Sequence, residues 1–327
     1  MLANARRGAT GRLLAALAAM ALVAAACGDD SPDPGTTGAD EGGRATLRIA
    51  YVPATTALAL HVADQQGFFD EHDLDVTLTE AANISDIPAT LGRQFDLSMG
   101  TATDLIRAGA AGIDVVQVAG NTVSTAENPF VRVITRPDSG ITDVAGLKDK
   151  TVASPTLSGV IHVAVLFWAK QEGVDPASIK GVQVPPPNLA DQLTGGRVDA
   201  VEALEPFATQ LVKAGNVSLG DPFSVIADPL ATNFIIAQGS WAEANGAVVD
   251  RFVAAMEQAV DFIGSSPDEA RAILRGYTGL PEPVASSVAL PEFDVEVRVG
   301  DLGRWIEVLR EVDQFDAEVE PEDLVVQ

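Results

Sequence analysis

Hydrophobic and polar residues follow two alternating periods along the first part of the chain. Residues 46–52 (TLRIAYV) and 74–79 (LDVTLT) alternate apolar with polar positions, which predicts two strands. Between them, residues 53–72 repeat apolar positions at helical spacing, and Gly67 can end that helix. The same order continues in shorter segments, with a helix over 87–92, a strand over 95–99, a helix over 101–111 and a strand over 114–119. This β-α-β order predicts a mainly parallel sheet flanked by helices.

A second series with the same order begins near residue 131. Its predicted strands are 131–136, 151–154, 182–187, 198–204, 223–228 and 232–238. Its predicted helices are 159–172, 189–195 and 206–214, followed by a helical tail over 241–245, 247–263, 267–274 and 301–312. Two such series predict an α/β protein with two lobes, in which the chain crosses near 131–136 and 232–238. We therefore expect lobe 1 to comprise 45–133 and 232–327, and lobe 2 to comprise 134–231.

The N-terminal residues have the organisation of an export signal. Arg6, Arg7 and Arg12 precede an uncharged apolar stretch over 13–26 that ends in small residues. This stretch is too short for a transmembrane helix, which needs about 20 apolar residues. The pattern is typical of a signal peptide that is removed from the mature protein, here over 1–26.

Cys27 is the only cysteine of the chain. It can therefore form neither an internal disulfide nor a zinc site built from several cysteines. Together with Ala24, Ala25 and Ala26 it resembles the lipobox of bacterial lipoproteins, although that pattern usually has Leu at the position of Ala24. The resemblance implies that Cys27 is lipidated and becomes the new N-terminus, whereas the alternative is a small apolar residue within a helix. Residues 27–44 contain no large apolar side chain and predict a flexible linker, so we expect the lipid to be the only membrane contact.

The composition excludes several classes of partner. Hydrophobic residues make up 47% of the chain, which is enough for a globular core, and the formal net charge is −25. Such a charge argues against binding to nucleic acid and against electrostatic binding to anionic lipid. The three histidines (His61, His72 and His162) are scattered along the sequence, so we expect no histidine-built metal site and no cofactor.

Candidate ligand-binding residues lie where predicted strands lead into helices. In open α/β sheets, ligands bind beyond the carboxyl ends of the strands, where helix N-termini supply free N–H groups and a partial positive charge. Four such junctions occur, over 51–56, 100–103, 155–159 and 205–207. The candidates at the first three are Tyr51, Thr55, Thr56, Thr101, Ala102, Thr103, Thr156, Ser158 and Gly159. Hydroxyl and N–H groups can hold a sulfonate or nitrate without Lys or Arg, but Ser and Thr also commonly cap helices.

Two carboxylates add a different chemistry to this set. Glu202 lies within an otherwise apolar strand, and Glu205 directly precedes a proline. If these carboxylates face the cleft between the two predicted lobes, they favour a ligand that carries an amine or N–H donors. Alternatively, Glu202 forms a salt bridge at a sheet edge and Glu205 caps a helix, because an unpaired buried carboxylate is costly. Asn233, near the return crossing, is a further candidate, together with Phe234 and Asn121.

Three segments resemble those of a known family. They are QGFFDEHDLDVTL (66–78), GLKDKTVASPTLSGVIHVAVLFWAKQEGV (146–174) and GGRVDAVEALEPFATQLVKAG (195–215). In this order and spacing they resemble the ABC-transporter solute-binding proteins for nitrate, sulfonates and taurine. The resemblance runs from about residue 46 to the C-terminus. It implies a periplasmic-binding-protein-like fold of type II, in which two lobes, each a mainly parallel sheet flanked by helices, are joined by a two-strand hinge.

The resemblance implies a receptor and not an enzyme. We expect an exported, monomeric lipoprotein at the outer face of the cytoplasmic membrane. It would capture a small anionic or zwitterionic ligand, such as a sulfonate, taurine or nitrate, and deliver it to an ABC permease and its ATPase. Two alternatives stay open, because the same superfamily includes binders of thiamine-precursor pyrimidines and a cytosolic pyrimidine synthase. The export signal argues against the second of these.

Overall fold

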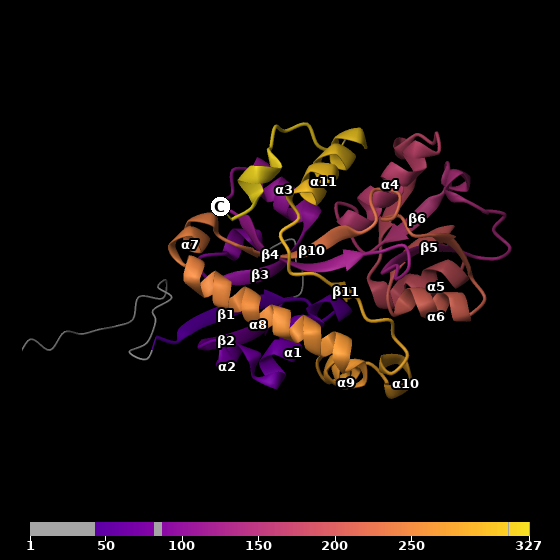
Figure 1. Ribbon diagram of the computed structural model, residues 1–327. Coiled ribbons are helices and arrows are strands. Elements are labelled where there is room, and N and C mark those ends of the chain that lie inside the picture. Colours follow the sequence, from indigo (N-terminus) through magenta and orange to yellow (C-terminus); the bar gives the residue numbers. More distant parts are fainter. Residues whose placement is uncertain (1–42, 82–86, 313, 327) are drawn as a thin grey trace, which may run out of the picture. The chain divides into compact units, whose positions relative to one another are not determined.

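A computed structural model of the protein describes residues 43–81, 87–312 and 314–326 (Figure 1). The predicted signal segment 1–26 lies outside these residues, as do Cys27 and nearly all of the predicted linker 27–44. Within the described part of the chain, no helix combines the length and the apolar character that crossing a membrane requires.

Sheet 1 has six strands in the order β11-β4-β10-β3-β1-β2. The strands are β1 (Ala45–Tyr51), β2 (Leu74–Glu80), β3 (Leu97–Thr101), β4 (Val116–Ser124), β10 (Leu230–Ala237) and β11 (Glu292–Phe293). β1 runs parallel to β2 and β3, whereas β10 runs antiparallel to β3 and β4, and β11 antiparallel to β4. The alternating segment at the start of the chain forms β1 because Leu47 and Ile49 enter the core while Thr46 stays exposed.

Sheet 2 has five strands in the order β7-β6-β8-β5-β9. The strands are β5 (Val131–Thr135), β6 (Thr151–Ser154), β7 (Lys180–Gln183), β8 (Ala200–Leu204) and β9 (Val217–Gly220). β6 runs parallel to β7 and β8, whereas β5 runs antiparallel to β8 and β9. The chain passes from sheet 1 to sheet 2 over 125–130 and returns over 221–229.

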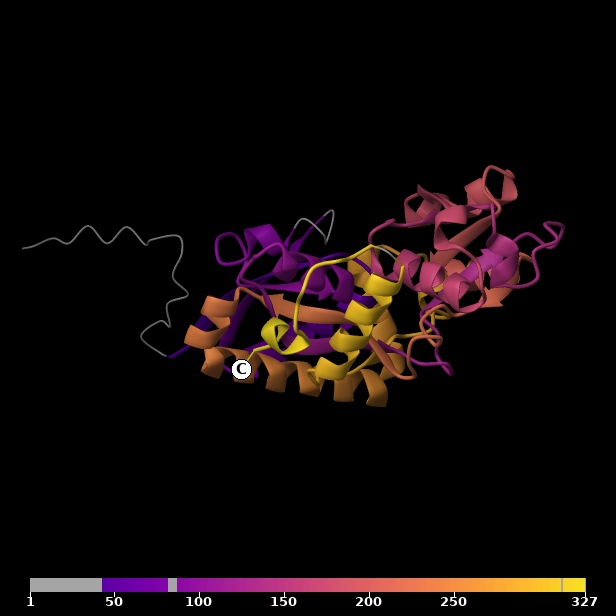
Figure 2. The same ribbon diagram turned by 90° about the horizontal axis from the view of Figure 1, so that it is seen from above.

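Helices cover both faces of each sheet (Figures 1 and 2). In sheet 1, Ile235 of β10 packs with one group of helices, and its neighbours Phe234 and Ile236 pack with the other. The first group is α1 (Leu58–Gln66), α8 (Gly246–Ser265) and α9 (Pro267–Thr278), and the second is α3 (Ala102–Ala110) and α11 (Val299–Glu311). In sheet 2, α4 (Val160–Gln171) faces α5 (Leu189–Thr194) and α6 (Phe207–Lys213) across the strands. Three short helices complete the set: α2 (Phe68–Glu71), α7 (Gly239–Ala244) and α10 (Glu282–Ala285).

The predicted α/β class with two helix-flanked sheets is confirmed, but the strand directions differ from the prediction. Each sheet is mixed and not mainly parallel, because the strands next to the two crossings (β4, β5, β9 and β10) all pair antiparallel. The predicted lobe limits stay a prediction. The sheets themselves divide between β4 and β5 and again between β9 and β10.

The strand predicted over 223–228 is wrong, because these residues form turns, and the strand before the return crossing is β9. The Asp221 carboxylate accepts hydrogen bonds from the N–H groups of Phe223 (3.0 Å) and Ser224 (3.2 Å), which bends the chain. The apolar character of the segment reflects tertiary packing, since Phe223 is fully buried with its ring 5.9 Å from that of Trp305. The helix predicted over 87–92 is only a 3-10 turn over Pro88–Thr90.

Candidate functional site

A cavity of about 170 Å³ lies at the carboxyl ends of β1, β3 and β6, so strands of both sheets contribute to it. Its lining residues are Val52, Ala54, Thr56, Met99, Thr101, Asp104, Phe130, Thr156, Gly159, Val160, Ile161 and Asn233. Pockets for drug-sized ligands measure roughly 300–1,000 Å³. This cavity therefore suits a ligand of few atoms.

Five of the candidates proposed from the sequence line this cavity. They come from three of the four predicted junctions and from β10, and they are Thr56, Thr101, Thr156, Gly159 and Asn233. The fourth junction, over 205–207, contributes no lining residue. The structure thus brings together strand ends that lie more than a hundred residues apart in sequence, such as those of β1 and β6. The rule that ligands bind at the carboxyl ends of strands in open α/β sheets predicts this location.

The N-terminus of α3 carries its own negative charge at the cavity. The Thr101 hydroxyl group accepts a hydrogen bond from the N–H of Asp104 (3.3 Å) and donates a hydrogen bond to the Asp104 carboxylate (2.6 Å). Thr101 is therefore a helix cap as well as a lining residue. Arg107, one turn further along α3, donates its hydrogen bonds to Gln314; burial lowers the pKa of Arg107, and the charge of Asp104 acts against this shift. A carboxylate at this position disfavours an anionic group of a ligand beside it.

The N-terminus of α4 lies on the same cavity without such a charge. Gly159 is its N-cap residue, no side chain caps it, and its first turn contains no acidic residue. Glycine at position 159 lets the Thr156 methyl group lie close to the backbone, because a Cβ atom at this position would lie 2.4 Å from that methyl group. The first N–H groups of a helix have no partner within the helix and carry a partial positive charge. This side of the cavity therefore favours a hydrogen-bond acceptor or an anion.

Four candidates next to these residues lie outside the cavity. Thr55, Ala102 and Thr103 are buried in the protein, whereas Ser158 is exposed to solvent. Successive residues of a helical turn point in different directions, so the neighbours of Thr56 and Thr101 face the core. The Thr55 hydroxyl has no hydrogen-bond partner among the described residues.

Tyr51 lies behind the cavity wall in a group of three aromatic rings. Its ring makes edge contacts with His61 at 4.7 Å and Tyr277 at 6.4 Å between centroids, and the last two rings stack at 3.8 Å. Burial lowers the pKa of His61 to about 4, so this imidazole is neutral near pH 7. Tyr51 does not line the cavity.

Glu202 forms a buried pair and does not line the cavity. It is fully buried on β8, the central strand of sheet 2, and not at a sheet edge as one alternative expected. One of its oxygens lies 2.7 Å from Nδ1 of His162 on α4, and the other has no partner among the described residues. Burial lowers the pKa of His162, but the charge of Glu202 and this hydrogen bond outweigh burial, and the pKa is raised above 6.5.

Glu205 takes the structural role that the sequence left open as an alternative. Its carboxylate pairs with Arg132 on β5 and accepts hydrogen bonds from the N–H (3.3 Å) and hydroxyl (3.0 Å) groups of Thr209 on α6. It is buried and does not line the cavity. Phe234 is likewise fully buried in the core, and Asn121 contacts the cavity wall from behind through the Thr56 carbonyl.

Seven lining residues were not predicted from the sequence. They are Val52, Ala54, Met99, Asp104, Phe130, Val160 and Ile161. Asp104 could have been found, because the spacing Thr101-x-x-Asp104 is that of a capping box. Phe130 comes from the first crossing between the sheets, and apolar residues in such a segment give no signal that separates lining from packing.

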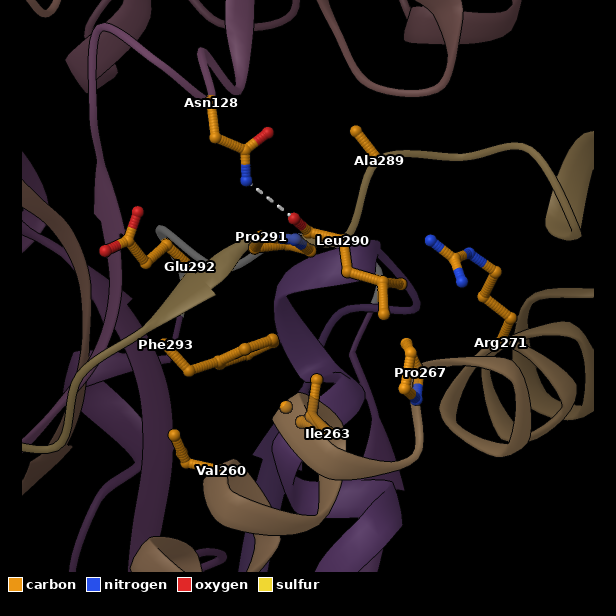
Figure 3. Close-up of a pocket in the computed structure, with 11 residues that line it drawn as sticks. Asn128, Val260, Ile263, Pro267, Arg271, Ala289, Leu290, Pro291, Glu292 and Phe293 are labelled. Atoms are coloured by element: carbon orange, nitrogen blue, oxygen red, sulfur yellow. Dashed lines mark hydrogen bonds between the residues drawn. The ribbon is translucent and has the colours of Figure 1, made fainter.

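A second hollow of about 490 Å³ lies near the C-terminal end of α8 (Figure 3). Val260, Ile263, Leu290 and Phe293 contribute apolar surface to it. Its polar groups already have partners: Arg271 donates to the Val288 carbonyl and pairs with Asp268, and Asn128 donates to the Leu290 carbonyl at 2.9 Å. None of the residues proposed from the sequence lines it. Among the described residues, no group of three His, Cys, Asp or Glu could hold a metal ion.

Comparison with known proteins identifies relatives of two kinds. Residues 54–270 match the family described as NMT1/THI5 like. The 4-amino-5-hydroxymethyl-2-methylpyrimidine phosphate synthase THI13 of Saccharomyces cerevisiae is 26% identical over 240 residues, which cover 69% of this chain and 68% of the yeast protein. The putative aliphatic sulfonates-binding protein of Escherichia coli is 27% identical over 197 residues, which cover 58% of this chain and 59% of that protein.

Solved structures share the fold. The periplasmic aliphatic sulphonate binding protein SsuA of Escherichia coli aligns with a TM-score of 0.74 at 21% identity, covering 86% of this chain and 97% of that one. The periplasmic nitrate-binding protein NrtA of Synechocystis aligns with a TM-score of 0.71 at 15% identity, covering 86% of each chain. These alignments confirm the predicted periplasmic-binding-protein-like fold. Since the family match spans more than half of the sequence, the chain belongs to the NMT1/THI5-like family.

Proposed function

We propose that the protein is an extracytoplasmic solute-binding lipoprotein that captures a small zwitterionic ligand of the aminosulfonate class and delivers it to an ABC importer. The observation that carries the ligand class is the unequal charge of the two helix N-termini at the cavity. The Asp104 carboxylate occupies the start of α3, whereas the start of α4 is uncapped. None of the lining residues is a Lys or Arg.

A ligand with an amine at one end and a sulfonate at the other fits these two helix termini. The amine would donate charge-assisted hydrogen bonds to Asp104, and the sulfonate would accept from the N–H groups at the start of α4. Met99 and Phe130 supply apolar surface for the short carbon chain between them. A simple anion such as nitrate would meet the same carboxylate without an amine to compensate for it, and is therefore disfavoured.

The receptor role and location rest on relatives and on the sequence. The aligned structures are periplasmic binding proteins, one for aliphatic sulphonates and one for nitrate. The export-signal pattern of 1–26 fits the same side of the membrane. We propose binding without chemistry, because Asp104 is the single ionisable side chain among the lining residues and has no second acid or base beside it in the cavity.

An aminopyrimidine is the second candidate ligand. The curated relatives include pyrimidine phosphate synthases, and Asp104 can accept hydrogen bonds from an amino group as well as from an amine. Met99 and Phe130 can contact the faces of a flat ring. This candidate keeps the receptor role and changes only the ligand.

Thermal unfolding and titration calorimetry of the domain from residue 43 onward separate these ligands. The probes are taurine, ethanesulfonate, nitrate and 4-amino-5-hydroxymethyl-2-methylpyrimidine. Taurine at 100 times its Kd should stabilise the protein by about 2.7 kcal/mol. Ethanesulfonate, which lacks the amine, should bind at least about tenfold more weakly. Equal binding of ethanesulfonate or nitrate would contradict the zwitterion proposal, a response to the pyrimidine alone would establish the second candidate, and conversion of any probe to a product would overturn the receptor role.

Lipidation of Cys27 predicts where the protein is found in the cell. In a bacterial host, Cys27→Ser should move the protein from the membrane fraction to the soluble extracytoplasmic fraction, because it removes the only acylation site. The affinity for the ligand should not change, because the cavity is built from residues 52–233. Labelling with a radioactive or alkyne fatty acid checks the anchor directly. A wild-type protein that takes up no label would contradict the proposal.

A further inference from the structure

One wall of the cavity is the loop between β1 and α1. Val52, Ala54 and Thr56 of this loop line the cavity, and each is followed or preceded by a residue that faces the core. The loop contains a single short 3-10 helix, Thr55–Ala57, that no side chain caps. The backbone bonds that hold it are few: Ala54 N–H donates to Val52 O (2.7 Å), Ala57 N–H donates to Ala54 O (3.1 Å), and Leu58 N–H donates to Thr55 O at the start of α1. Its position therefore depends on contacts from other elements.

Tyr277 on α9 holds the middle of this loop. Its hydroxyl group donates a hydrogen bond to the Ala54 carbonyl at 2.8 Å, across 223 residues of sequence. The ring is fixed from the other side, since it stacks on His61 with 3.8 Å between centroids and 7° between planes. Burial raises the pKa of Tyr277 well above its ordinary value of 10, so the hydroxyl keeps the proton that it donates.

Asn121 on β4 holds the end of the same loop. Its Nδ2 group donates to the Thr56 carbonyl at 3.0 Å. The side chain is 1% exposed. Its amide nitrogen, and not its amide oxygen, faces Thr56, because a carbonyl oxygen accepts a hydrogen bond only from a donor. Its Oδ1 atom has no partner among the described residues, so the contact with Thr56 is the hydrogen bond that fixes this amide.

We infer that Tyr277 and Asn121 are positioning residues, which hold the 52–56 wall in its binding geometry without touching the ligand. This inference rests on the proposed function only in naming ligand affinity as the outcome. Neither side chain lines the cavity, and each bonds a carbonyl of a residue that does. A loop held in place before binding loses less conformational entropy when the ligand arrives, so affinity depends on both hydrogen bonds.

The first test is Tyr277→Phe, which removes one hydroxyl and leaves the ring stack on His61. Hydrogen exchange in the ligand-free protein should become about fivefold faster at the Ala57 and Leu58 amides, as expected for loss of one net hydrogen bond of about 1 kcal/mol. The Kd for taurine, or for the aminopyrimidine if that is the probe that binds, should rise by a similar factor. Thr278→Val is the matched control, since it removes a neighbouring hydroxyl that donates to Leu274 within α9, and it should leave both readouts unchanged.

The second test is Asn121→Leu, alone and combined with Tyr277→Phe. If both side chains hold one loop, the double variant should weaken binding by a factor that differs from the product of the single effects, because the sites are coupled through the loop. Unchanged exchange at Ala57 and Leu58 in both single variants would overturn the inference, whatever the ligand. Faster exchange with unchanged affinity would overturn its link to binding. If no probe binds the wild type, the proposed ligand class fails, and the exchange result still decides whether the two residues position the loop.

Discussion

Replacing His162 with leucine should lower the free energy of unfolding by about 3–5 kcal/mol, because the fully buried Glu202 would lose its partner. The second oxygen of Glu202 already lacks a hydrogen bond among the described residues, so nothing nearby compensates for the loss. Urea denaturation of the domain from residue 43 onward measures the change. The double variant His162→Leu/Glu202→Leu is the control, since it removes both charges and should recover most of the stability. A single variant that costs less than about 1 kcal/mol would show that the pair contributes little to folding.

The same pair should make the stability of the protein depend on pH. The pKa of His162 is raised above 6.5 in the folded protein, chiefly by Glu202 against the effect of burial. The folded protein thus holds this proton more tightly than the unfolded chain does. The stability from the bound proton is complete below pH 6.5 and is lost as the pH rises through the folded pKa. The variant His162→Leu/Glu202→Leu should lack this fall in stability with rising pH. Identical pH profiles of the wild type and the double variant would contradict the prediction.

Changing Asp104 to asparagine should weaken taurine binding by about tenfold to a hundredfold. A hydrogen bond to a charged group contributes about 1.5–3 kcal/mol, and asparagine keeps the size of aspartate and an oxygen that can accept from Thr101. Ethanesulfonate, which carries no amine, should bind equally well or more tightly, because the like charge is gone. Titration calorimetry with both ligands gives the comparison.

Asp143→Asn is the matched control for this substitution. Asp143 also starts a helical turn and accepts a hydrogen bond from Gly146 N–H at 3.0 Å, but it does not line the cavity. Its replacement removes the same formal charge and should leave both affinities unchanged. If Asp104→Asn changes the Kd of taurine less than twofold, Asp104 serves only in the capping interaction with Thr101, and the ligand carries no amine at this position.

The two-sheet architecture could be predicted because most of the predicted strands overlap strands of the structure and follow one another in two series with the helices between them. In β1, for example, Leu47 and Ile49 enter the core while Thr46 stays exposed. The strand directions could not be predicted, since antiparallel pairing of β10 with β3 and β4 depends on contacts between residues far apart in sequence. The strand predicted near Phe223 is wrong for the same reason. The apolar residues there are buried by packing against Trp305, and burial alone does not distinguish a strand from a turn.

The candidate site shows the same division between local rules and tertiary contacts. Thr56, Thr101 and Thr156 line the cavity, as expected for residues that follow parallel strands. Their neighbours Thr55 and Thr103 face the core, a difference of one or two residues that depends on the exact start of each helix. The role of Glu202 could not be assigned without His162, which lies forty residues earlier on a different element.

The position of β10 has a consequence for how the chain reaches its folded state. Among the described residues, β4 pairs with β10, with β11 and, at Gln117, with Val325, and all three partners follow the whole of sheet 2 in sequence. During synthesis or export, β4 therefore emerges long before any of these partners, and both of its edges stay unpaired. Closing a loop of that length costs entropy before any pairing compensates for it. A chain truncated before residue 230 would keep two open edges on β4, which is the kind of surface that other strands add to and that a chaperone must cover until synthesis is complete.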